Sequence, residues 1–199
     1  MPLDAPPGYA ARRLDPLRDA PSVIGLIRAH YPDVVVGMES GHLEPGFWGE
    51  TPHLHGIVVH AGNGELAAFL TAQYEPRGRT LTGRLVVVAP AHRGAGLGKL
   101  LAGHATEVLA RELGAEIALS YATLKHSMSQ AILEDTGYVL VGLVPAHDRD
   151  MVSPGEVRRV WEALYAKRFV ADAEILAPNP DALLPAAARM LAAIRWPGG

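Results

Sequence analysis

The chain has no cysteine among its 199 residues, which excludes disulfides, thiolate metal sites and a cysteine nucleophile. It also lacks any apolar run near the roughly 18 residues that a membrane span needs. Its first residues do not show the basic and apolar layout of a secretory signal. We therefore expect a cytoplasmic protein with no membrane partner, whose chemistry uses serine, histidine or no covalent intermediate.

An excess of one charge is missing as well. The chain carries 18 Lys and Arg against 21 Asp and Glu, for a net charge of −3, and no basic run stands out. A nucleic-acid or other polyanion surface needs such a run, so we expect no nucleic-acid partner. The composition, 49% hydrophobic and 20% charged, is typical of one globular domain with a sizeable core.

One stretch combines a strand end, a glycine-rich turn and a helix start. Val86, Val87 and Val88 end a β-branched run that predicts a buried strand, and Pro90 stops it. Glycines follow at positions 94, 96 and 98, and then an amphipathic helix with an apolar face of Leu97, Leu100, Leu101, His104, Val108 and Leu109. Because glycine lets a ligand approach the backbone and free N–H groups open the helix, the stretch predicts a phosphate or pyrophosphate site.

The spacing of the glycines separates three known phosphate motifs. A P-loop fails, because Gly94 to Gly98-Lys99 is one residue short and Leu100 stands where a hydroxyl is needed. A dinucleotide fingerprint fits poorly, because the glycines are spaced two and two. Arg93-x-x-Gly96-x-Gly98 after a Val-x-Pro strand end resembles the acetyl-CoA-binding signature of the GNAT N-acetyltransferase superfamily.

The resemblance extends from about residue 9 to about residue 144. An apolar strand-like segment at 116–122 is followed by a short helical segment at 127–136 and by Gly137-Tyr138, in the family's order. It implies an α+β fold, a mixed sheet in a three-layer α/β/α arrangement, with two splayed parallel strands that admit pantetheine. We expect an acetyltransferase core over residues 1–150, completed in the same domain by residues 151–199.

The resemblance also implies how acetyl-CoA is held. The N–H groups of the turn would bind its pyrophosphate, namely those of Arg93, Gly94, Ala95, Gly96, Leu97, Gly98 and Lys99. The edge of Val86, Val87 and Val88 would bind pantetheine, with an N–H near Val86 polarising the thioester carbonyl. His126-x-x-Ser129-Gln130 resembles the element that opens this helix in a bacterial subset of the family, and it places His126 where an asparagine usually contacts the cofactor, so the resemblance implies that His126 and Ser129 help to bind it.

The acid and the base of the reaction are open at this stage. The family's tyrosine acid falls on Leu133, so another group or solvent must protonate the thiolate. His126 and Tyr121 are the candidate catalytic residues; the alternatives are a helix cap for His126 and a core aromatic for Tyr121. A water chain could serve as the base, as could Glu39, Glu50, Glu75 or Glu116.

The remaining elements follow from local signals. We expect a strand at 9–14, a helix from Asp15 or Asp19 to Tyr31, and strands at 54–60 and 65–74 joined by a type I′ turn at Asn63-Gly64. Further strands are expected at 81–88 and 138–144, and a terminal helix at 181–194 that packs on the domain or on a second subunit. Residues 157–165 have helical spacing, but the family topology needs a strand there, which we favour.

Four histidines, at 42, 53, 55 and 60, invite a metal site, but no cysteine or helical His-x-x-x-His pair accompanies them. We expect no metal and interpret them as surface or cleft residues. Phe47 and Trp48 either line an acceptor pocket or pin a long loop to the core, and we favour the second interpretation.

The leading hypothesis is direct acetyl transfer from acetyl-CoA to a primary amine of a small molecule, by a chain that can form a homodimer. One alternative is an acyl-CoA-binding regulatory module with little turnover, suggested by the leucine at position 133. The other is transfer to a protein lysine or N-terminus.

Overall fold

The computed structural model describes residues 3–196, in which seven strands form one sheet of order β1-β2-β3-β4-β5-β7-β6. Neighbouring strands are antiparallel except for β4 and β5, which are parallel. The strands are β1 (Tyr9–Arg13), β2 (Leu54–Ala61), β3 (Leu66–Glu75), β4 (Thr80–Val88), β5 (Ile117–Thr123), β6 (Val139–Ser153) and β7 (Glu156–Arg168). This is the mixed α+β sheet that the sequence predicts.

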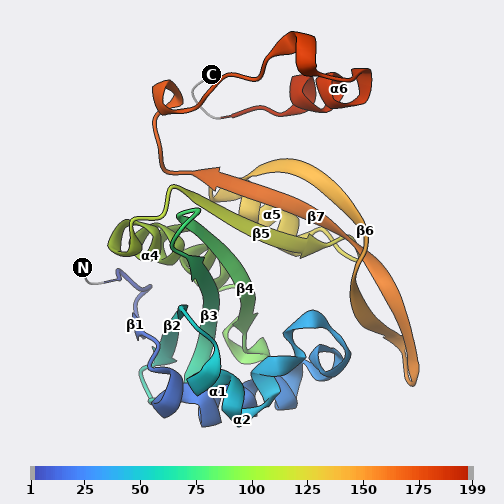
Figure 1. Ribbon diagram of the computed structural model, residues 1–199. Helices are drawn as coiled ribbons and strands as arrows, with labels where there is room; N and C mark the ends of the chain where they lie inside the picture. Colours follow the sequence, from blue (N-terminus) through green and yellow to red (C-terminus); the bar gives the residue numbers. More distant parts are fainter. Residues whose placement is uncertain (1–2, 197–199) are drawn as a thin grey trace.

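Helices cover both faces of the sheet (Figure 1). One face carries α1 (Pro16–His30), η1 (Pro32–Val36), η2 (Met38–Leu43) and α2 (Pro45–Glu50). The other carries α3 (Leu97–Lys99), the π-helical η4 (Leu100–Ala105), α4 (Thr106–Leu113) and α5 (Met128–Asp135), with η3 (Pro90–His92) before the turn. The last part holds η5 (Asp172–Glu174), η6 (Pro180–Ala182) and α6 (Pro185–Ala193). None of the helices within residues 3–196 is long and apolar enough to cross a membrane.

Alternation along the strands supplies two apolar cores, one on each face. On β3, Phe69 is fully buried against the α1 and α2 side, while Leu70, next in sequence, is 3% exposed in the core under α3 and α4. The helical face predicted after the turn is buried at Leu97, Leu101 and Leu109. The sheet is therefore the middle of three layers.

The parallel strands β4 and β5 pair only over a short stretch. Their register runs from Thr80 opposite Ile117 to Thr82 opposite Leu119 and then ends. Farther along, Val86, Val87 and Val88 pair with β3 alone. The edge of β4 toward β5 is thus left without a strand partner, as the expected splay requires.

Two local predictions have different outcomes. Asp15 caps α1 as expected, because its carboxylate accepts hydrogen bonds from the N–H groups of Leu17 and Arg18 at 3.1 Å. The type I′ turn is wrong, because among residues 62–64 only Gly64 has positive φ, at 85°. The hairpin closes instead over three residues, with the Ala61 N–H donating to the Glu65 carbonyl at 2.9 Å.

Residues 157–165 are a strand, and β6 runs on to residue 153, well beyond the predicted end at 144. The helical spacing misleads there because its members do not share a buried face: Tyr165 is 1% exposed and Trp161 is 53% exposed. These residues instead form the backbone hydrogen bonds of the long β6–β7 hairpin, which the spacing of apolar residues along the sequence does not predict.

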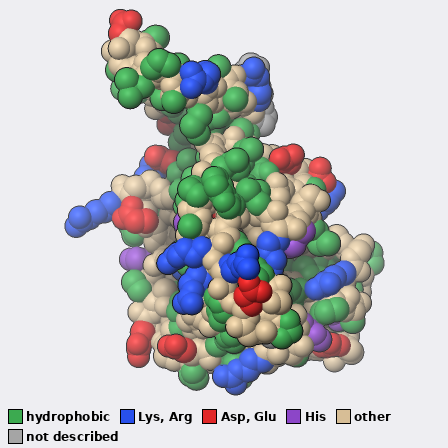
Figure 2. All heavy atoms as spheres, turned by 90° about the vertical axis from the view of Figure 1, so that its right-hand side faces the viewer, with side chains coloured by type: hydrophobic (Ala, Val, Ile, Leu, Met, Phe, Trp, Pro, Cys, Tyr) green, Lys and Arg blue, Asp and Glu red, His purple; other side chains and the backbone are tan. Residues whose placement is uncertain are grey.

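The C-terminal arm, residues 170–196, stands away from the body in Figure 1. Its helix α6 begins later than predicted and exposes Leu184 and Met190. Figure 2 shows hydrophobic side chains gathered on the arm and on the body beneath it. The arm contacts the body through Arg168 of β7, which pairs with Asp172 at 2.8 Å and lies 4.1 Å from the Trp196 ring centroid. Helix α6 itself is exposed and not packed on its own domain as one alternative expected, and its packing on a second subunit stays a prediction.

Candidate active site

The glycine turn has the left-handed backbone that glycine favours. Gly94 has φ 82° and Gly96 has φ 79°, and a Cβ at either position would meet nothing within 4 Å. The left-handed backbone is therefore the reason for glycine at these two positions, and the space beside them is open. Gly98 has a different role, because a Cβ there would lie 3.0 Å from Cδ1 of Ile132 on α5, so glycine lets the two helices approach.

The basic side chains of the turn contact other residues of this chain. The Arg93 guanidinium donates to the Tyr31 hydroxyl at 3.0 Å, and that hydroxyl donates to the Val88 carbonyl at 2.6 Å. Lys99 pairs with Asp135 on α5 at 2.7 Å, with both side chains more than half exposed. An exposed pair of this kind contributes little stability.

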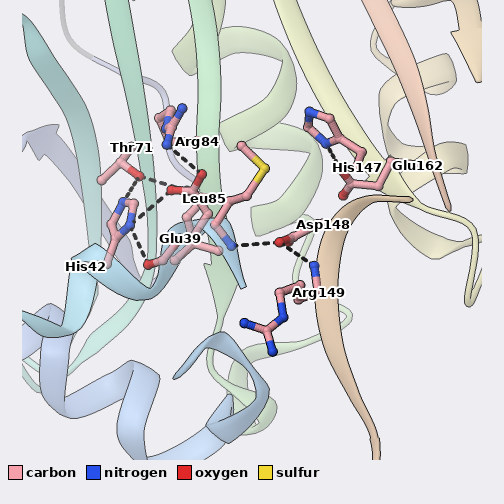
Figure 3. Close-up of polar contacts among 10 residues, drawn as sticks. Glu39, His42, Thr71, Arg84, Leu85, His147, Asp148, Arg149 and Glu162 are labelled. Atoms are coloured by element: carbon pink, nitrogen blue, oxygen red, sulfur yellow. Dashed lines mark hydrogen bonds and ion pairs between the residues drawn. The ribbon is translucent and has the colours of Figure 1, made fainter. Parts of the chain in front are cut away.

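On the opposite face of the sheet, β4 contributes a charged side chain through a β-bulge. Thr71 of β3 pairs with Leu85, but Ala72 pairs with Gly83, so Arg84 is the extra residue. The Arg84 guanidinium lies 3.0 Å from the Glu39 carboxylate in η2. This ion pair forms one wall of a polar cleft (Figure 3).

His42 supports this wall from inside. Its side chain is fully buried, with Nε2 2.8 Å from the Thr71 hydroxyl and Nδ1 3.0 Å from the Glu39 carbonyl. The Trp48 indole donates to the His42 carbonyl at 3.2 Å, and the Phe47 ring centroid lies 4.4 Å from the imidazole. The surface or cleft interpretation was thus wrong for His42, whereas Phe47 and Trp48 do pin the loop.

The facing wall comes from β6 and β7, where the ladder is again irregular. Val144 pairs with Glu162 and Asp148 with Val160, so residues 145–147 lie opposite Trp161 alone. Ala146 within this bulge has φ 55°, a conformation that a non-glycine residue adopts only under strain.

The bulge brings a histidine and a carboxylate together. His147 Nδ1 is in hydrogen-bond contact with the Glu162 carboxylate, and the imidazole stacks on Tyr121 of β5, with ring centroids 4.2 Å apart and planes inclined by 12°. Below them, the Asp148 carboxylate accepts from the Met38 N–H at 2.7 Å and so ties β6 to η2. Figure 3 shows His147 and Glu162 across from Glu39 and Arg84, with Asp148 beneath.

The cleft is acidic. Burial raises the pKa of Glu162, and the negative charges of Asp148 and Glu39 raise it further, against the lowering effect of His147. Carboxylates from three elements are therefore close enough to affect one another. A cation entering the cleft would relieve this repulsion.

The raised pKa of Glu162 leads to a stability prediction. The folded chain holds this proton more tightly than the unfolded chain, so the stabilisation is complete below the ordinary value of 4.5 and is lost as pH rises through the folded value. Glu162→Gln removes the cost of ionisation, so we expect its melting temperature to exceed that of the wild type near pH 7.5 and to match it near pH 4. Thermal melts of both proteins at the two pH values test this, and a gain of equal size at both would contradict it.

The predicted site residues are divided between the cleft and other places. Tyr121 lies in the cleft, whereas His126 is exposed before α5, where its carbonyl accepts from Gln130 Nε2 at 2.9 Å, and Ser129 lies half-buried in the first turn of that helix. Leu133 is 6% exposed, in the apolar core.

Of the four acids considered as a base, Glu39 is the one whose contacts lie in the cleft. Glu75 accepts from the Arg77 N–H at 2.9 Å in the β3–β4 turn, and Glu116 pairs with Arg79 near the start of β5. Glu50 is exposed on α2. Sequence reasoning missed Arg84, His147, Asp148 and Glu162, because no local motif marks them and the signal for β6 fades after residue 144.

Comparison with known proteins agrees with this geometry. The profile of the acetyltransferase (GNAT) family matches residues 3–138. A streptothricin acetyltransferase of Streptomyces lavendulae is 31% identical over 140 residues, which are 70% of this chain and 71% of that protein.

Solved structures are similar as well. A nourseothricin acetyltransferase has TM-score 0.58 and 25% identity, over 81% of this chain and 98% of its own. A dodecameric spermidine N-acetyltransferase from Vibrio cholerae, at 14% identity, has TM-score 0.63 over 81% of this chain and 94% of its own, which shows likeness of fold.

Proposed function

This chain belongs to the GNAT acetyltransferase family, and on that premise we propose that it transfers the acetyl group of acetyl-CoA directly to a primary amine of a small cationic molecule. The observation that carries the proposal is the splay between β4 and β5, which separates a glycine turn on one side of the sheet from an acidic cleft on the other. The turn suits an anionic phosphate, and the cleft suits a protonated amine.

The residues at the splay fit acetyl-CoA. The edge of Val86, Val87 and Val88 that lacks a strand partner suits pantetheine, which would lie along it as a further strand does. The amides of residues 93–99 would hold the pyrophosphate, since positive φ at Gly94 and Gly96 leaves the approach open. His126 and Ser129, at the start of α5, are proposed as further contacts.

Acetyl-CoA supplies an acetyl thioester whose carbonyl carbon an amine can attack. An N–H near Val86 would polarise that carbonyl. The thiolate can leave without a strong acid, because an ordinary thiol has a pKa of about 8.5. Solvent or Tyr121, whose ring stacks on His147 in the cleft, would supply its proton.

The acceptor class follows from the charge of the cleft. Asp148 and Glu39 come from other elements than Glu162 and lie close enough to raise its pKa, while Arg84 pairs with Glu39 and offsets part of this charge. A molecule with one or more ammonium groups complements this site. Because the relative at 31% identity is a streptothricin acetyltransferase, streptothricin is the first acceptor to test.

The test uses the whole chain and two measurements. Thiol release from acetyl-CoA is followed with streptothricin, spermidine and a neutral alcohol as a control, and the product is identified by the mass of one added acetyl group. A melting shift with acetyl-CoA reports binding independently. A shift without thiol release on any amine would favour the regulatory binding module, and acetylation confined to added proteins would favour the protein acetyltransferase.

A further inference from the structure

We propose that His147 is the general base that takes the proton from the acceptor ammonium, and that Glu162 is the residue that positions it. The inference rests on the proposed acetyl transfer and assigns a group in the cleft that the sequence did not single out. It is carried by the hydrogen bond, the ring stack and the strained bulge that together hold one imidazole at the cleft.

The hydrogen bond selects which ring nitrogen can act. Nδ1 of His147 is the nitrogen in contact with the Glu162 carboxylate. Because an ionised carboxylate can only accept a hydrogen bond, the proposal places the proton of the neutral ring on Nδ1 and its lone pair on Nε2. The His147 side chain keeps 22% of its surface exposed and that of Glu162 keeps 13%. The Glu162 side chain is thus the more buried of the two, and part of the His147 ring keeps its contact with solvent.

The backbone and β5 fix the plane of this ring. Residues 145–147 bulge out of the β6–β7 ladder, and the Arg159 guanidinium donates to the Ala146 carbonyl at 3.0 Å and holds the bulge. Tyr121 then stacks on the imidazole face. A bulge that strains an alanine to φ 55° and redirects a histidine is typical of a functional site rather than of a plain hairpin.

Charged and polar groups from the neighbouring elements surround the His147–Glu162 pair. They are Asp148 on β6, Glu39 in η2, Arg84 on β4 and the hydroxyl of Tyr121 on β5. Together with Glu162 on β7, three of these groups are carboxylates and one is a cation. The surplus of negative charge attracts an ammonium toward the imidazole.

A base is needed because a primary ammonium with a pKa of about 10.4 is less than one part in a thousand free amine at pH 7. The first proton passes from the ammonium to Nε2 of His147 and then to water. The nitrogen lone pair forms the C–N bond to the thioester carbonyl carbon, and the C–S bond breaks with its electron pair on sulfur. The second N–H proton is released to water, while Tyr121 or solvent protonates the departing thiolate, and Tyr121 regains its proton from water. The net products are the amide, the thiol of coenzyme A and one proton.

His147→Ala tests the proposal together with added imidazole. We expect kcat/KM for the amine to fall by about 10²- to 10⁴-fold, its decline at acidic pH to disappear, and imidazole to restore part of the rate. The melting shift with acetyl-CoA stays unchanged. Glu162→Gln, which keeps a hydrogen-bond partner, lowers kcat by up to about 100-fold through misplacement of the ring.

His53→Asn is the matched control, because His53 is an exposed histidine before β2 with φ 54°, which asparagine tolerates. It should retain the wild-type rate and pH profile. If the wild type turns over and His147→Ala keeps its rate, or keeps the acidic decline, the assignment of the base is overturned while the proposed function stands.

Imidazole ¹⁵N spectra of the labelled chain give a readout that needs no acceptor. We expect the neutral His147 ring to carry its proton on Nδ1, and this preference to weaken in Glu162→Gln. A ring with its proton on Nε2 in the wild type would overturn the proposal whether or not an acceptor has been found, because no lone pair would then face the cleft.

Discussion

Gly96→Val is expected to weaken acetyl-CoA binding by at least about 100-fold. Gly96 has φ 79° directly before the helix that begins at Leu97, and a β-branched residue there is strained by about 1–3 kcal/mol. The open space beside Gly96 is the approach that we propose for the pyrophosphate, so a valine both distorts the amides and fills the site. Isothermal titration with acetyl-CoA measures the loss.

Gly155→Val separates this effect from strain alone. Gly155 lies in the β6–β7 turn with φ 77°, and a Cβ there also meets nothing within 4 Å. The two substitutions should therefore lower the melting temperature by similar amounts, while Gly155→Val keeps the affinity for acetyl-CoA. If Gly96→Val also keeps the wild-type affinity for acetyl-CoA, the glycine turn does not bind coenzyme A.

Glu39→Gln is expected to raise the KM of the amine by about 10- to 100-fold and to leave acetyl-CoA affinity unchanged. The Glu39 carboxylate lies 3.0 Å from the Arg84 guanidinium at the wall of the cleft, with 18% of its side chain exposed. A hydrogen bond from a cation to such a carboxylate contributes about 1.5–3 kcal/mol, most of which an amide loses. Without the negative charge of Glu39, the Arg84 guanidinium is no longer neutralised and repels an ammonium. Initial rates over a range of amine concentrations measure the change.

Glu75→Gln is the control for this experiment. Glu75 carries the same charge but caps the β3–β4 turn, where its carboxylate accepts from the Arg77 N–H, and it has no contact in the cleft. Its KM should equal that of the wild type. If both variants raise KM alike, the acceptor responds to net charge and not to the wall of the cleft. If neither does, the acceptor binds elsewhere.

The turn that we propose for the cofactor could be predicted from the sequence because its residues are contiguous. A strand, two glycines with positive φ and a helix start lie within residues 86–98, and each has a local physical reason: β-branching, left-handed backbone and unpaired N–H groups. Gly98 is the exception, because its reason is the close approach of Ile132. The cap at Asp15 and the splay were predicted in the same way, from a local motif and from the family that the turn resembles.

The acceptor cleft was decided by the tertiary structure alone. Glu39, Arg84, His147 and Glu162 lie on four elements, up to 123 positions apart in sequence, and no one of them stands in a motif. Two β-bulges orient Arg84 and His147, and a bulge arises only when one of two paired strands has an extra residue. Neither strand of such a pair encodes that difference by itself. The local sequence therefore determined the glycine turn that we propose for the phosphate, whereas the pairing of distant strands determined which charges lie together in the cleft that we propose for the amine.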